Sequence, residues 1–208
     1  MFSFSHLKHS VLALAVLGII ALAHGTAKAD AIGTCNPDSP GQCSIAVNIT
    51  GNILTITLNN TSPPANGGFL TALAFNLTPG TTVNNFTSTN ANFALFGPSP
   101  TGWTGSVSPD GTRTHLISAT GNDYNGGGNP SGGTPPGSSV TFTVTLASLN
   151  GNTEASVFDS ILARQRGFQD GGSDKDALVE VPEPASMLLL GTGLIGAAAG
   201  LRRRFRQK

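Results

Sequence analysis

Few residues of this 208-residue chain have types and spacing that could support catalysis. The segment between residues 30 and 180 has a single histidine, His115, and no G-x-S-x-G sequence, so a hydrolytic triad lacks an evident base and nucleophile. Glu154 and Asp159 are the carboxylate pair that a glycoside hydrolase could use, but any domain with nine acids offers such a pair by chance. The sequence therefore predicts no catalytic residue and no enzymatic activity.

Three carboxylates, those of Asp170, Asp174 and Asp176, lie on one glycine-rich stretch. Ca²⁺ prefers oxygen ligands of this kind, but the stretch lacks the spacing of an EF-hand loop and its closing bidentate Glu. We therefore expect a linker toward the C-terminal segment, with a calcium site as the weaker alternative, and no other metal or cofactor.

Two aromatic residues, Trp103 and Tyr124, could stack on sugar rings as in carbohydrate-binding modules. Such sites usually show several exposed aromatics, and Trp103 within Gly-Trp-Thr-Gly fits a core position equally well. Tyr124 lies in residues 121–139, which hold seven Gly and three Pro and are expected to form a long mobile loop.

The N-terminal residues 1–29 have the pattern of a secretory signal peptide. Lys8 precedes 13 uninterrupted apolar residues, Val11–Ala23, and Ala27-Lys28-Ala29 forms a small-residue cleavage site before Asp30. Thirteen helical residues span about 20 Å, which is too short for a bilayer core of about 30 Å. We expect signal peptidase to cleave after Ala29.

Export affects the interpretation of the only two cysteines, Cys35 and Cys43. An oxidising compartment favours their pairing, and the spacing matches no CxxC metal or redox motif. We expect a disulfide.

The C-terminal residues 181–208 have three parts in a fixed order. Pro182-Glu183-Pro184 is followed by 17 uncharged residues, 185–201, which suit a short transmembrane helix. A basic tail comes last, with Arg202, Arg203, Arg204 and Arg206. Such a cluster keeps its end of the helix cytoplasmic, so the segment before the helix is exported.

This arrangement resembles the PEP-CTERM sorting signal of exported proteins in Gram-negative bacteria that make extracellular polysaccharide. The resemblance implies recognition of Pro182, Glu183 and Pro184 by the processing enzyme exosortase. It also implies an inner-membrane precursor that contacts the membrane transiently and then reaches the cell surface or the extracellular matrix. An extracellular polysaccharide is then a candidate partner.

The exported segment, residues 30–180, is expected to be all-β. Apolar and polar residues alternate with a period of two, as in half-buried strands. The clearest segments are Ile45–Ile49, Leu54–Leu58, Leu73–Leu77 and Val140–Leu146. Weaker candidates are Phe93–Phe96, Thr114–Ala119 and Ile161–Phe168, the last of which could also be a helix. We predict a single antiparallel β-sandwich domain, flanked by the signal peptide helix and the transmembrane helix.

The charge of the exported segment excludes a nucleic-acid partner. Residues 31–181 hold four cations against nine acids, a net charge of −5. The sequence as a whole predicts a non-enzymatic surface or biofilm-matrix protein with a structural or adhesive role, whose uncharged Thr, Asn and Ser faces meet matrix polymers. The alternatives are a carbohydrate-binding module, with calcium near Asp170–Asp176, and a glycan hydrolase.

Overall fold

The computed structural model describes residues 30–35, 38, 40–97, 103, 105–107, 110–121, 123–125, 129–181 and 192–193. The predicted signal peptide and nearly all of the predicted transmembrane helix lie outside these residues. Within the described part of the chain, no helix is both long and apolar enough to cross a membrane.

Ten strands make up most of the described chain, and every pair of neighbouring strands is antiparallel. They are β1 (Ala31–Cys35), β2 (Cys43–Thr50), β3 (Ile53–Asn60), β4 (Gly67–Phe75), β5 (Val83–Ser88), β6 (Ala94–Phe96), β7 (His115–Ser118), β8 (Ser139–Leu146), β9 (Leu162–Phe168) and β10 (Ser173–Glu180). The short helices are η1 (Pro64–Asn66), η2 (Pro130–Gly132) and α2 (Glu154–Phe158). The predicted all-β class is confirmed.

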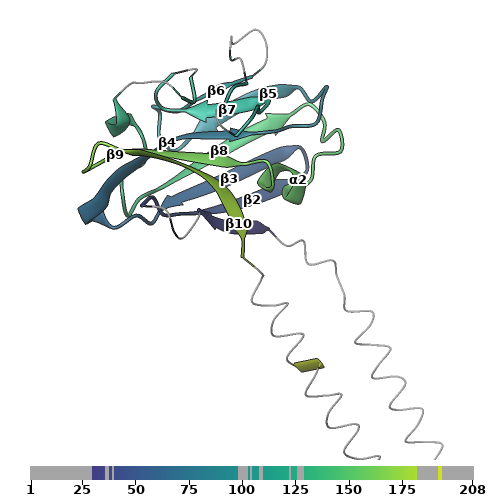
Figure 1. Cartoon of the computed structure of the whole chain (residues 1–208). Coiled ribbons are helices and arrows are strands. Elements are labelled where there is room, and N and C mark those ends of the chain that lie inside the picture. The colour runs from purple at the N-terminus through teal and green to yellow at the C-terminus, as the bar shows by residue number, and fades with distance from the viewer. Residues whose placement is uncertain are drawn as a thin grey trace, which may run out of the picture.

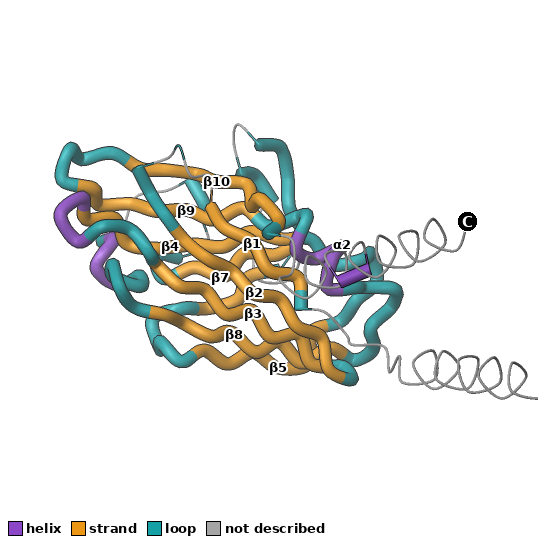
Figure 2. Tube along the Cα trace, turned by 90° about the horizontal axis from the view of Figure 1, so that it is seen from below, coloured by secondary structure: helices purple, strands orange, loops and turns teal. Residues whose placement is uncertain are grey.

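The strands follow the order β5-β8-β3-β2-β1-β10-β9-β4-β7-β6 in one continuous sheet. We call β5, β8, β3, β2 and β1 the first sheet half, whose strands lie side by side in Figure 2, and β9, β4, β7 and β6 the second sheet half. Strand β10 joins them, because residues 173–177 pair with β9 and residues 178–180 pair with β1. The predicted sandwich is thus one sheet folded over itself into a barrel-like form (Figure 1).

The main core lies between the two sheet halves. Alternate residues of β2, β3 and β8, such as Ile45, Ile56 and Phe142, pack in one cluster with Leu73 and Ile117 of the second half. The period of two places all these side chains on one face of their strands. The predicted segments Ile45–Ile49 and Leu54–Leu58 form the hairpin of β2 and β3, joined by a turn in which Gly51 has a φ of 57°.

A second, smaller core covers the outer face of the second sheet half. Trp103, Val107 and Tyr124 are buried there against Ala72 and Leu116. The Tyr124 hydroxyl donates a hydrogen bond of 3.1 Å to the carbonyl of Ala163. Apart from η2 and the first residue of β8, the described part of residues 121–139 is a loop, as expected, but it is not a free one, because Tyr124 anchors it to the sheet.

The same segment is anchored again further along. Thr134 is buried, and its carbonyl accepts a hydrogen bond of 3.0 Å from the Leu70 amide of β4. The sequence pattern missed both anchors because a single aromatic or Thr among glycines gives no periodic signal.

Three strands, β1, β5 and β10, were not predicted. The linker that we expected around Asp170–Asp176 is wrong. A tight turn follows Phe168, and from Ser173 onward the chain pairs with β9 as strand β10. Its sequence, SDKDALVE, places charges on both faces, which obscures the alternation. The segment Ile161–Phe168, which could have been a strand or a helix, is a strand, β9, over residues 162–168.

The predicted disulfide is confirmed between Cys35 and Cys43, whose Cα atoms lie 5.0 Å apart. It connects the end of β1, the neighbour of β10 in the first sheet half, to the start of β2.

Candidate functional site

The single histidine of the β domain is packed rather than placed in a catalytic arrangement. His115 is 7% exposed and stacks on Phe75 with ring centroids 5.5 Å apart. Its Nδ1 shares a hydrogen bond of 2.9 Å with the Thr114 hydroxyl, and burial lowers its pKa to about 4. The imidazole is therefore neutral at pH 7 and fits a structural role.

The two carboxylates considered for glycoside hydrolysis belong to opposite ends of α2. Oε1 of Glu154 accepts a hydrogen bond of 2.7 Å from the Ile49 amide, which ties the helix to the end of β2. Asp159 is exposed at the C-terminal end of α2. The residues that line the hollow beside α2 include neither carboxylate.

Two of the three aspartates considered for calcium accept hydrogen bonds from backbone amides, and the third is buried. Asp170 accepts from the Gly172 amide at 2.8 Å within the turn before β10, and Asp174 accepts from the Gly41 amide at 3.2 Å. Asp176 is buried on β10. Among the described residues, no three His, Cys, Asp or Glu side chains gather closely enough to hold a metal ion.

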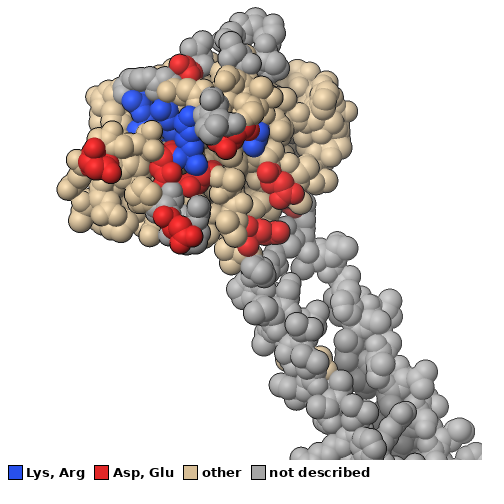
Figure 3. All heavy atoms as spheres, in the orientation of Figure 1, with Lys and Arg blue, Asp and Glu red and all other residues tan. Residues whose placement is uncertain are grey.

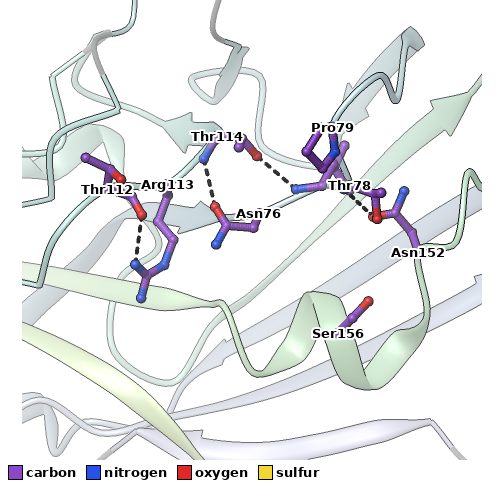
Figure 4. Close-up of a pocket in the computed structure, with 9 residues that line it drawn as sticks. Asn76, Thr78, Pro79, Thr112, Arg113, Thr114, Asn152 and Ser156 are labelled. Atoms are coloured by element: carbon purple, nitrogen blue, oxygen red, sulfur yellow. Dashed lines mark hydrogen bonds between the residues drawn. The ribbon is translucent and has the colours of Figure 1, made fainter.

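A hollow of about 430 Å³ lies between α2, residues 76–79 and residues 112–114 (Figure 4). Its polar groups are used by the fold: Oδ1 of Asn76 accepts from the Thr114 amide at 2.9 Å, and Oδ1 of Asn152 accepts from the Thr78 amide at 2.8 Å. The Arg113 guanidinium donates to the carbonyls of Thr112 and Ser160. These bonds fix loops to one another, so this hollow has a structural role.

A second hollow, of about 460 Å³, lies on the outer face of β9 and β10 and is lined by cationic side chains. Arg164 and Arg166 are two residues apart on β9 and therefore share a face. Lys175 of β10 is the register partner of Arg164, and Ser173 is the partner of Arg166. In the orientation of Figure 3, most of the visible Lys and Arg atoms gather in one patch, with acidic side chains beside it and a smaller basic area apart from it.

Arg164 and Lys175 hold the loop that covers this face. The buried Arg164 guanidinium donates to the backbone carbonyls of Tyr124 and Asn125, and Nζ of Lys175 donates to Oδ1 of Asn125 at 2.7 Å. Both cations also lie over the Tyr124 ring, 5.9 and 5.8 Å from its centroid. Burial first, and then neighbouring cations, lower the pKa of Arg164 and of Lys175.

Arg166 differs from its two neighbours. It is partly exposed, it lines the hollow, and its Nη1 is buried with no hydrogen-bond partner in the described part of the chain. From the sequence alone these cations indicated nothing beyond the net charge of the segment. The spacing of Arg164 and Arg166 was a usable signal, but their closeness to Lys175 depends on the β9–β10 register.

The predicted sugar-stacking aromatics are not available on the surface. Trp103 is 5% exposed and Tyr124 is fully buried, both in the second core. The core alternative is correct for Trp103, whereas the burial of Tyr124 in the same core was not predicted.

The exported and C-terminal parts of the chain meet at β10. The Val181 amide donates a hydrogen bond of 2.9 Å to the Ile32 carbonyl, so the start of β1 and the end of β10 lie side by side. The predicted processing residues begin at the next position, Pro182. The Pro-Glu-Pro motif, the arginine tail and the signal-peptidase site at Ala27 and Ala29 lie outside the described residues.

The described residues thus form an antiparallel β domain built from one folded sheet, and its last strand leads directly into the C-terminal segment. The family model of the PEP-CTERM protein-sorting motif matches residues 180–204, from the last residue of β10 into the arginine cluster. The chain is a PEP-CTERM domain-containing protein, and its motif marks it for export and sorting by exosortase to the cell surface or extracellular space. No curated protein matches the chain.

Proposed function

We propose that this protein is a non-enzymatic surface or matrix protein of an exopolysaccharide producer, and that its β domain adheres to extracellular polysaccharide through the outer face of the first sheet half. The observation that supports this most directly is the composition of that face. None of the residues in β2, β3, β5 and β8 is charged, although these strands form the broadest regular surface of the domain.

Hydroxyl and amide side chains line up in rows across the face. One row contains Asn48, Thr55, Thr143 and Thr87, which are successive register partners on β2, β3, β8 and β5. The adjacent row includes Thr57 and Thr141, whose hydroxyls lie 3.3 Å apart. Neighbouring strands are about 4.8 Å apart, so the rows repeat polar groups at short, regular intervals.

Such a surface suits a polymer rich in hydroxyl groups. Each Thr or Asn can donate and accept hydrogen bonds, and an uncharged surface loses less hydration free energy on contact than a charged one. Individual contacts of this kind are weak, so binding would depend on many of them along one chain of polymer.

The test is co-sedimentation of the exported protein with the neutral polysaccharide fraction of its host. Thr143→Lys places a charge in the centre of the face and is expected to reduce the bound fraction severalfold. Thr112→Lys, a substitution of the same type at an exposed loop position over the second sheet half, is the matched control. Equal binding by all three proteins, or no binding by the unmodified protein, would refute the adhesive role. Release of shorter oligosaccharides from the polymer would refute the non-enzymatic one.

A further inference from the structure

We propose that the hollow on the outer face of β9 and β10 binds an acidic group of a polysaccharide, a carboxylate or a sulfate ester, with Arg166 as the direct ligand. The assignment of a polysaccharide rests on the proposed function, whereas the oxyanion chemistry rests on the hollow itself. The residues that line the hollow include Asn125, Pro130, Arg164, Arg166, Gly171 and Ser173.

The first argument is the distribution of charge. Residues 31–181 hold only four cations against nine acids, yet Arg164, Arg166 and Lys175 share one face of two neighbouring strands. Like charges opposite each other destabilise a sheet, so this concentration carries a cost to the fold. An anionic ligand in the hollow would offset that cost.

The second argument is a division of roles among the three cations. Arg164 and Lys175 donate hydrogen bonds to the loop at residues 124 and 125. Asp123 acts electrostatically on both of these cations, and Asp110 acts on Lys175 as well. The Arg166 side chain does not hold the loop: its Nη1 is buried with no hydrogen-bond partner among the described residues, as is Nε of Arg164. An unsatisfied guanidinium is costly to the fold, and Arg166 is partly exposed where it lines the hollow, so a ligand oxygen there would offset part of that cost.

The third argument is the shape of the site. A volume of about 460 Å³ is within the range of small-molecule sites and holds one or two sugar units. Gly171 has open space where a side chain would stand, so the backbone there can be approached closely, and Ser173 is exposed opposite Arg166. The planar fork of a guanidinium matches the two oxygens of a carboxylate or sulfate.

The same features do not suit a nucleic acid. Single-stranded nucleic acids are bound by stacking on exposed aromatics, and both Trp103 and Tyr124 are buried. Duplex binding requires an extended basic surface, whereas this patch has three cations and adjoining acids.

The experiment is calorimetric titration of the whole protein with oligogalacturonate, dextran sulfate and neutral dextran at low salt. Arg166→Gln is expected to weaken binding of at least one acidic polymer by about 10- to 100-fold, the loss typical of a charge-assisted hydrogen bond. Arg113→Gln removes the same charge outside the hollow and is expected to change that affinity less than twofold. The polymer that responds to Arg166→Gln identifies the group as a carboxylate or a sulfate.

A second variant keeps the result interpretable if Arg166→Gln is poorly folded. Ser173→Glu retains every cation but places a carboxylate opposite Arg166, where it competes with the ligand, and is expected to cause a similar loss. Circular dichroism melts verify that each variant is folded.

The outcomes separate the two proposals. If both variants bind acidic polymers as the unmodified protein does, the hollow is not the site, although binding of neutral polymer that Thr143→Lys removes would still support the proposed function. If no acidic or neutral polymer binds, both proposals fail. Tighter binding of duplex DNA than of oligogalacturonate, lost in Arg166→Gln, would overturn the assignment to a polysaccharide.

Discussion

The buried imidazole of His115 is expected to make the stability of the domain depend on pH below neutrality. Its pKa is about 4 in the folded protein, because burial disfavours the charged form, against 6.5 in an unfolded chain. Above pH 6.5 both states are neutral at this site. Between pH 6.5 and 4 only the unfolded state takes up the proton, so the free energy of unfolding falls as the pH falls.

The difference of 2.5 between the two pKa values sets the size of the effect. Proton linkage gives a loss of about 2 kcal/mol at pH 5 and about 3 kcal/mol at pH 4, relative to pH 7. Below the folded pKa both states are protonated, and the loss from this group levels off.

The assay is urea unfolding of the whole protein and of His115→Gln at pH values between 7 and 4. At pH 7 the variant is expected to be the less stable protein, because it loses the stacking of His115 on Phe75. Taking the difference between the two proteins at each pH cancels the carboxylates and the three N-terminal histidines. The advantage of the unmodified protein should shrink as the pH falls. A difference that stays constant from pH 7 to 4 would refute the neutral, buried imidazole.

Three further perturbations test other parts of the structure. Reduction of the Cys35–Cys43 disulfide should lower the free energy of unfolding by about 2.5 kcal/mol on the chain-entropy model. The measurement is urea unfolding with and without reductant, and a Cys35→Ser/Cys43→Ser protein should show no response to the reductant. Tyr124→Phe removes the hydroxyl that donates to a β9 carbonyl and should cost about 1 to 2 kcal/mol in the same assay, so an unchanged midpoint would argue against the anchored loop. The intact mass of protein recovered from the host's surface or medium should correspond to a chain that begins at Asp30 and ends near Glu183. A mass that includes the arginine tail would mean a permanent anchor, and Glu183→Ala should increase the proportion of that longer form.

The sequence by itself determined the features that depend on neighbouring residues or on short linear signals. Alternation at every second residue identified β2, β3 and β8, because half-buried strands impose that period locally. The sorting motif was recognisable in the same way, since its three parts follow one another along the chain. The disulfide followed from having only two cysteines in an exported segment, with no dependence on the fold.

Only the tertiary structure decided what happens where distant segments meet. Tyr124 looked like part of a mobile loop until the second sheet half supplied a surface to bury it. Asp176 looked like a linker residue, and it is buried because β10 must join the two sheet halves. The site around Arg166 depends on the register that sets Lys175 opposite Arg164. Strand register is set by packing and turn geometry over the whole domain. A shift of one residue between β9 and β10 would separate the cations of the site, and the sequence alone does not show which register is adopted.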